Sequence, residues 1–239
     1  MTEEKTHNIT KRANKFIPDP LVETGTANDQ DYAGSGYDRG HMAPAGDMGW
    51  SVTSMAESFY YSNMSPQEPG FNRGIWKKLE ELVRTWAIDY QDIYVVTGPV
   101  LTKGLKSIGE HHVAVPKYYY KVILDYHPNG AKGIGFILPN SSSGKSLWNY
   151  AVTIDSVEHF TGIDFFPQLP DDQEEIIEST LTLNSWIWNS TNSSIQREKR
   201  SISIQCKGIT KAGNRCKNIT HNVSGYCNHH KYQYSSSFK

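Results

Sequence analysis

One amphipathic helix followed directly by strand-forming segments is the pattern that most constrains the fold of this chain. Residues 72–89 carry apolar side chains at steps of three and four, the spacing of one buried helical face. Apolar runs typical of strands follow at 93–97, 113–125 and 132–138, and the turn before the last run favours a hairpin. Strands clustered among helices predict an α+β domain, with a central antiparallel sheet flanked by helices.

Glycine and proline mark the expected ends of these segments. Gly98-Pro99 is expected to stop the first strand, and Pro116 to interrupt the second. The first 36 residues are polar and irregular, which predicts loop. Further helices are expected at 52–63, 153–161 and 171–183.

Length and charge suggest one large domain with a small appendage. The 239 residues can bury a sizeable core, and no apolar run approaches the roughly 20 residues that span a bilayer, so no membrane partner is expected. The net charge of −1 hides an asymmetry, because residues 195–239 contain nine Lys and Arg but one acid. Such a basic tail can be a solvated extension or a segment that binds a polyanion, and the charge by itself favours the solvated extension.

All three cysteines lie in the last 34 residues, which argues against a complete disulfide set and for a metal site. Cys206, Cys216, Cys227 and His230 form a set of four ligands that suits tetrahedral Zn²⁺, with His229 as the alternative fourth ligand. Three unligated thiols are the competing interpretation. A segment of about 29 residues is too short to form a stable hydrophobic core without a cross-link such as this metal site. The expected organisation is a domain at 1–184 (core 32–183), a linker at 185–203, a zinc module at 204–232 and a tail at 233–239.

The sequence Tyr-Asp-Arg-Gly-His-Met-Ala-Pro at 37–44 concentrates reactive side chains. Asp38, Arg39 and His41 place a carboxylate, a fixed cation and a titratable base within four residues, and Gly40 is expected to let the backbone bend between them. The cation can hold an anion, the imidazole can move a proton and the carboxylate can orient a neighbour. This combination suits a reaction on a phosphate.

Two polar residues on the predicted helix lie at or near its buried face. On a helical wheel Asn72 falls inside the apolar stripe, where it can cap the helix or turn its amide oxygen to a hard cation such as Mg²⁺. The helix alone favours the cap. Glu80 lies at the edge of the stripe, either as a surface glutamate or within reach of a metal-bound water.

Together these motifs resemble the DNA/RNA non-specific endonuclease family, the ββα-metal or His-Me finger nucleases. The resemblance covers residues 32–169, and its motifs occur in family order and spacing. They are Gly-Tyr-Asp-Arg-Gly-His-Met-Ala-Pro at 36–44, Phe-Tyr-Tyr-Ser-Asn-Met-Ser-Pro-Gln at 59–67, Phe-Asn-Arg-Gly-Ile-Trp at 71–76 with Leu79-Glu80, Val-Val-Thr-Gly-Pro at 95–99, His-Val-Ala-Val-Pro at 112–116 and Thr-Gly-Ile-Asp-Phe-Phe at 161–166.

The resemblance implies an activity, cofactors and site residues. It implies metal-dependent hydrolysis of DNA and RNA with 5′-phosphate products, Mg²⁺ or Mn²⁺ at the active site, and a ββα-metal fold. It matches His41 to the general base, Asn72 to the protein ligand of the metal and Arg39 to the phosphate contact. Asn63 and Glu80 match residues that support the metal-water cluster and the base, and Asp38 matches an aspartate that shapes the site. The resemblance therefore favours Asn72 as ligand over cap.

The chain departs from the family in its first residues. The family usually has a strand, and often a further arginine, before the histidine motif. Arg12 is the candidate for that cation, and a solvated loop arginine is the competing interpretation. The tail resembles small bacterial Cys₃His modules appended to nucleases, and its lysines and arginines suggest that it holds phosphates, with protein docking as the competing role.

The expected partners are DNA and RNA, a second copy of the chain and an inhibitor protein. The alternative function is a non-catalytic nucleic-acid-binding protein on a nuclease scaffold. The chain opens Met-Thr-Glu-Glu-Lys, with no charged and apolar leader. An unguarded non-specific nuclease would endanger its host in the cytosol, which favours a secreted or periplasmic location.

Overall fold

A four-stranded antiparallel sheet forms the centre of the larger part of the chain in the computed structural model. Its strand order is β3 (Tyr94–Pro99), β6 (Tyr118–Asp125), β7 (Lys132–Pro139) and β8 (Ala151–Val152). The β6–β7 hairpin, in which Ile123 pairs with Ile134, confirms the predicted one. The predicted α+β class and its central antiparallel sheet are confirmed as well.

The structure describes residues 1–2, 8–127, 130–188, 204–210, 212–220, 227 and 230. The chain divides into two compact units, Met1–Trp186 and Ile187–Lys239. Most of the predicted linker, 189–203, and the tail, 233–239, lie outside the described residues. Among the described residues, none of the helices is both long and apolar enough to cross a membrane.

One predicted strand boundary is wrong. The strand expected to stop at Gly98-Pro99 runs through both residues, because β3 is an edge strand, where a proline that lacks an N–H is tolerated. The interruption predicted at Pro116 is confirmed, and the two strands on either side of it belong to different sheets. The first, β5 (Val113–Ala114), pairs with β4 (Ser107–Ile108), and only β6 joins the central sheet.

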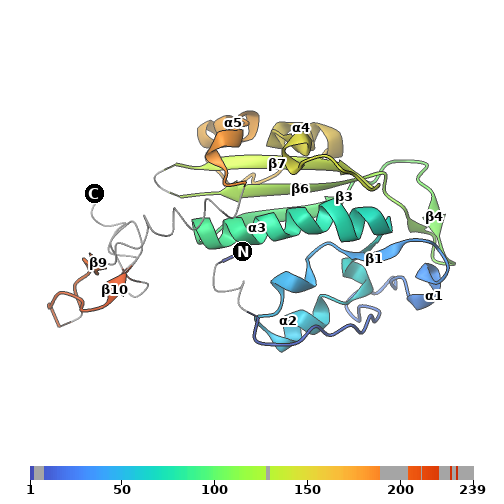
Figure 1. Ribbon diagram of the computed structural model, residues 1–239, viewed down its shortest axis with the longest axis horizontal. Coiled ribbons are helices and arrows are strands. Elements are labelled where there is room, and N and C mark those ends of the chain that lie inside the picture. The colour runs from blue at the N-terminus through green and yellow to red at the C-terminus, as the bar shows by residue number, and fades with distance from the viewer. Residues whose placement is uncertain are drawn as a thin grey trace. The chain divides into compact units, whose positions relative to one another are not determined.

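Helices cover both faces of the central sheet (Figure 1). On one face lies α3 (Lys77–Tyr90), which buries Leu79, Val83 and Trp86. On the other face lie α4 (Ile154–Thr161), capped by the Thr153 hydroxyl, and α5 (Asp171–Ser179). α5 is shorter than predicted and is followed by a short 3₁₀ turn at Leu183–Ser185. A further 3₁₀ turn, Leu147–Tyr150, leads into β8.

Glycines on β7 let α4 and α5 approach the sheet. A Cβ on Gly133 would lie 2.5 Å from the Ile154 side chain, and one on Gly135 would lie 2.5 Å from the Val157 side chain. Ile154, Val157 and Ile177 thereby pack into a cluster with apolar residues of β6. This side of the sheet is a separate apolar core from the one under α3.

The histidine motif forms a strand, which the sequence did not predict. β1 (Asp38–His41) pairs antiparallel with β2 (Met64–Gln67), and His41 lies opposite Met64. The bend expected at Gly40 is wrong. Instead, the Gln67 side chain occupies the space beside Gly40, where a Cβ would lie 2.1 Å from it. Short helical segments surround this pair of strands: α1 (Asp29–Tyr32), α2 (Val52–Glu57) and the 3₁₀ turns Ala45–Asp47 and Tyr61–Asn63.

The predicted helix at 72–89 does not begin as an α-helix. Residues Phe71–Trp76 form a π-helical segment kinked at Gly74, whose φ of −104° and ψ of −109° are not helical, and α-helical geometry starts at Lys77. Such segments occur frequently at functional sites. β1, β2 and this helical unit together form a strand–strand–helix arrangement.

The second unit contains a short antiparallel pair. β9 (Ile204–Gln205) pairs with β10 (Ile219–Thr220), and an isolated bridge joins Ile209 to Arg215. The buried Cys206, Cys216 and Cys227 form a small cluster of their own.

Candidate active site

A pocket of about 350 Å³ lies between β1 and the start of α3. It brings together four of the predicted site residues from distant parts of the sequence: Arg39, His41, Asn72 and Glu80. Its wall also contains four further cations, namely Arg12, Arg73, Lys77 and Arg84. Five cationic side chains and one carboxylate line this pocket, which favours anions there, and four of these cations also pair with acids around it.

His41 ends β1 and is almost fully buried against aromatic rings. Its side chain packs edge-on to Phe59 at a centroid distance of 4.8 Å and lies 6.0 Å from Phe16. Burial, together with the charge of Arg12, lowers the pKa of His41 to about 4, so the imidazole is neutral at pH 7. Its Nε2 is buried and has no hydrogen-bond partner among the described residues. A neutral imidazole with an unused ring nitrogen can accept a proton.

Asn72 is held by Asp38. Asn72 Nδ2 donates to Asp38 Oδ2 at 2.9 Å, so the amide oxygen is the atom left for another partner. The cap interpretation is wrong, because the side chain bonds to β1 instead of to the helix start. It is the Glu68 carboxylate that accepts the Phe71 N–H at 2.8 Å.

Asp38 also binds a cation of the pocket. Arg73 Nε and Nη2 donate to its two carboxylate oxygens at 2.8 and 2.6 Å, and the Arg73 side chain is 72% exposed. Asp38 therefore does not line the pocket but fixes two residues that do. This placement agrees with a shaping role better than with proton transfer.

Arg39 is fixed by both polar and aromatic neighbours. Its Nη2 donates to Asp29 at 2.8 Å and its Nε donates to the Tyr61 hydroxyl at 2.9 Å. The guanidinium carbon lies 5.0 Å from the centroid of the Phe16 ring and 5.6 Å from that of Tyr32. A cation held in this way is preorganised to meet a phosphate.

Arg12 lies on the pocket wall, in an exposed loop segment. Its guanidinium carbon lies 4.9 Å from the centroid of the Phe59 ring, and its Nε donates to Asn14 at 2.8 Å. The same Phe59 ring packs against His41. The structure thus brings the candidate upstream arginine beside the histidine.

Glu80 belongs to a partly buried charge network instead of the protein surface. Burial raises the pKa of Glu80 to about 7, while the charges of Lys121 and Arg84 oppose that rise. Lys121, on β6, is 1% exposed, donates to Thr97 Oγ1 at 2.6 Å and lies 4.9 Å from the Trp76 ring.

Sequence reasoning missed Lys121. The signal was a lysine in the apolar run Tyr-Tyr-Tyr-Lys-Val-Ile-Leu, since a fully buried lysine needs partners. Burial lowers the pKa of Lys121, and the charges of Glu80 and Asp47 raise it. Asp47 is paired with Arg84 at 2.6 Å, so two acids and two cations share this region.

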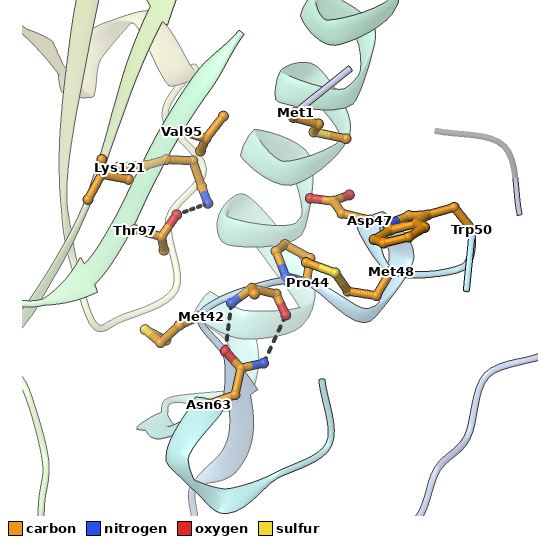
Figure 2. Close-up of a pocket in the computed structure, with 12 residues that line it drawn as sticks. Met1, Met42, Pro44, Asp47, Met48, Trp50, Asn63, Val95, Thr97 and Lys121 are labelled. Atoms are coloured by element: carbon orange, nitrogen blue, oxygen red, sulfur yellow. Dashed lines mark hydrogen bonds between the residues drawn. The ribbon is translucent and has the colours of Figure 1, made fainter. Parts of the chain in front are cut away.

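Asn63 holds the chain that follows His41. Its Oδ1 accepts the Ala43 N–H and its Nδ2 donates to the Ala43 carbonyl, both at 2.9 Å, and Nδ2 also donates to the Ser58 carbonyl at 2.8 Å. Figure 2 shows the first two bonds beside a cavity of about 520 Å³, with the Lys121–Thr97 bond on its far wall. Asn63 faces this cavity and does not line the pocket of His41.

The second unit holds the predicted Cys₃His set. Cys227 Sγ lies 3.3 Å from His230 Nδ1 and 3.8 Å from Cys216 Sγ, and Cys206 Sγ lies 3.7 Å from His230 Nδ1. Ligand atoms of a tetrahedral zinc site lie about 3.5–3.8 Å apart, given Zn–S near 2.3 Å and Zn–N near 2.0 Å. The four donors therefore fit Zn²⁺. His229, the alternative ligand, lies outside the described residues.

The donors of the pocket also fit a metal. Asn72 offers a neutral amide oxygen, and Glu80 offers a carboxylate in the same pocket. Mg²⁺ prefers oxygen ligands and is usually bound through few protein groups, since it keeps several waters.

Comparisons with known proteins agree with this geometry. Residues 2–172 match the family model described as DNA/RNA non-specific endonuclease. The chain is similar to the mitochondrial nuclease EXOG of Xenopus laevis, with 39% identity over 175 residues that cover 66% of this chain and 49% of that protein. It is also similar to nuclease C1 of Cunninghamella echinulata, with 41% identity over 65% of this chain and 67% of that one. The chain thus spans about half the length of the Xenopus relative.

A solved structure shares the fold. The crystal structure of the complex of EndoG with EndoGI, which concerns the mechanism of EndoG inhibition, superposes with a TM-score of 0.67 and 33% sequence identity. The match covers 72% of this chain and 78% of that one.

Proposed function

Because the chain belongs to the DNA/RNA non-specific endonuclease family, we propose that it hydrolyses phosphodiester bonds of DNA and RNA without marked sequence specificity. One observation carries this proposal: a buried, neutral His41 and the open amide oxygen of Asn72 share a pocket with five cations. Cations that bind phosphates do not by themselves read base sequence.

His41 is the proposed general base. Its imidazole takes a proton from the water whose oxygen bonds to phosphorus, the bond from phosphorus to the 3′ oxygen breaks, and that oxygen takes up a proton from a solvent water. The products have 5′-phosphate and 3′-hydroxyl ends. Because an external water attacks, no 2′-hydroxyl is needed, which is why both DNA and RNA are proposed substrates.

The other pocket residues bind and orient. Arg39 and Arg12 hold the phosphate, and Asp38 turns the Asn72 amide so that its oxygen faces the pocket. Asn72 Oδ1 would hold Mg²⁺ or Mn²⁺, which when bound offsets charge on the phosphate and on the leaving oxygen. Glu80 supports this site from α3, with its charge balanced by Lys121, and Asn63 keeps the segment after His41 in place.

A supercoiled plasmid tests the activity directly. We expect nicking and then linearisation with Mg²⁺, degradation of a structured RNA under the same conditions, and no cleavage after treatment with EDTA. Because EDTA also removes zinc, Mg²⁺ alone is added back, and restored cleavage assigns the requirement to the active site. Binding of both nucleic acids without cleavage in any metal would instead support the alternative function, a non-catalytic nucleic-acid-binding protein.

The C-terminal unit is proposed to be a zinc module that holds nucleic acid. The proposed organisation is a nuclease domain at 1–184, a linker at 185–203, the module at 204–232 and a tail at 233–239. The proposed ligands are Cys206, Cys216, Cys227 and His230. The short distances between their sulfur and nitrogen atoms support the assignment. Lys207, Arg215 and Lys217 follow or flank these cysteines, whereas Lys211 lies outside the described residues.

Neutralising the basic residues of the module should weaken binding without slowing chemistry. Changing Lys207, Arg215 and Lys217 to Gln is expected to raise KM and to reduce the slope of log KM against log salt by up to about 3, since each lost phosphate contact releases roughly one counterion less. kcat should stay nearly unchanged. Steady-state kinetics at several salt concentrations measure this, with Lys145→Gln, Lys103→Gln and Lys106→Gln in one control variant. An unchanged KM at every salt concentration would favour protein docking as the role of the module.

The EndoG structure contains its inhibitor EndoGI, so we also propose an inhibitor protein as a partner of this chain. A homodimer is a further proposal, which light scattering of the purified chain tests.

A further inference from the structure

A group of carboxylates lies between α4 and α5, away from the proposed active site. Asp155 and Glu158 come from α4 and Glu178 from α5, and one carboxylate oxygen of each lies within 4.8 Å of the others. These helices cover the face of the central sheet opposite α3, the helix that carries Glu80 (Figure 1). The group therefore has no part in the pocket of His41.

Glu178 is the unusual member of the group. It is 5% exposed, and its Oε1 is buried and accepts no hydrogen bond from any described residue. Glu174, one turn earlier on α5, also has a buried Oε1 without a partner in the described part of the chain. A buried carboxylate oxygen normally has a hydrogen bond or a bound cation, because losing water without compensation is costly.

The residues around Glu178 carry further negative charge. Burial and the charges of Glu158, Glu174, Asp155 and Asp164 raise the pKa of Glu178 to about 8. One oxygen of Glu158 accepts the Phe165 N–H at 2.6 Å, which fixes that side chain. Within the described residues, neither Lys nor Arg forms an ion pair with any of these five acids.

We propose that Asp155, Glu158 and Glu178 bind a divalent cation of the Ca²⁺ class that joins α4 to α5. All the donors are carboxylate oxygens, which are the ligands of hard cations. Two oxygens on one Ca²⁺ lie at most about 5 Å apart, given Ca–O distances of roughly 2.3–2.6 Å, and the three donor oxygens lie within 4.8 Å of one another. Ca²⁺ also accepts more irregular ligand arrangements than Mg²⁺ does, which suits side chains that come from two different helices. Asp155 is exposed, so water can complete the coordination.

The competing explanation is a proton shared between Glu178 and a neighbouring acid. The two explanations differ in how the Tm of the full chain responds to Ca²⁺. At Ca²⁺ about 100-fold above the dissociation constant, a site present only in the folded state is expected to raise the Tm by roughly 5–10 °C. A shared proton gives no rise.

The test compares Tm with and without Ca²⁺ in four proteins: wild type, Glu178→Gln, Glu175→Gln and Asn72→Ala. Glu175 is an exposed glutamate on the same helix, and Asn72→Ala reports any Ca²⁺ effect at the active site. We expect the rise in all but Glu178→Gln, and without Ca²⁺ we expect Glu178→Gln to melt above the wild type because repulsion is relieved.

No rise in the wild type, or an equal rise in Glu178→Gln, would overturn the proposal. If Glu178→Gln does not fold, Asp155→Asn replaces it, because this ligand is exposed and its loss leaves the helix packing intact. A diminished rise in Asp155→Asn supports the site, and an undiminished one contradicts it.

Discussion

Replacing His41 with Ala is expected to lower kcat by about 10²–10⁴-fold, the usual contribution of a general base. The loss should appear in kcat more than in KM, because five cations still line the pocket and bind the substrate phosphates. Plasmid nicking and a fluorescent oligonucleotide assay, both at saturating Mg²⁺, measure it. His159→Ala is the matched control, since His159 is exposed on α4 and lies on the other face of the sheet.

The pH profile separates proton transfer from a structural role of His41. Because the pKa of His41 is lowered to about 4, its neutral form persists from neutrality down to about pH 5 and is lost as the pH falls through 4. We therefore expect kcat/KM to fall, through protonation of His41, as the pH drops through about 4 and not already as it drops through about 6.5. Because the pKa of Glu80 is raised to about 7, its titration is expected to change kcat/KM near neutrality as well. The profile is therefore also measured in Glu80→Gln, which lacks that titration. Retained nicking by His41→Ala would refute the assignment of the base.

Asn72→Ala is expected to lower kcat by about 10²–10³-fold and to raise the Mg²⁺ concentration needed for half-maximal rate. The substitution removes the amide oxygen that is proposed to hold the metal, and the electrostatic contribution of a catalytic metal is several kcal/mol. A titration of the rate with Mg²⁺ and with Mn²⁺ measures both effects. Asn149→Ala serves as control, because Asn149 is an exposed asparagine whose amide bonds only locally, to the Ser146 carbonyl.

A structural explanation of the Asn72 result makes a different prediction. Loss of the bond to Asp38 alone would loosen Arg73 as well, and Asp38→Asn would then reproduce the defect with an unchanged Mg²⁺ requirement. If Asn72→Ala keeps the wild-type Mg²⁺ dependence, the amide is a positioning group and not a ligand.

The sequence predicts the sheet and most helices because their signals are local. The β6–β7 hairpin follows from apolar runs on either side of a turn, and α4 follows from the helical pattern of its own residues. The strand through His41 was missed because its four residues carry no apolar alternation, and its partner lies 23 residues further along the chain. Pairing of that kind depends on tertiary contacts that no local pattern encodes.

The site was predictable only in part, for a related reason. His41, Arg39, Asn72 and Glu80 could be named from motifs, and the structure brings all four into one pocket. The cap interpretation of Asn72 failed because the helical unit begins at Phe71, one residue earlier than expected, and the Asn72 side chain bonds across the fold to Asp38. Lys121 and the partners of Asp38 could not be foreseen, since both depend on which side chains face one another across the fold.

The π-helical segment also limits how this chain can vary in length. In regular helical geometry each residue turns the chain by about 100°. Deleting one residue from Phe71–Trp76 would therefore swing Asn72 away from Asp38, although the apolar face of α3 would still pack. An insertion or deletion in the exposed loop near Gly104 would leave both undisturbed. Among natural variants, five residues should thus lie between the positions of Phe71 and Lys77 even where the identities of those residues change, so we expect the spacing to be inherited more strictly than the composition.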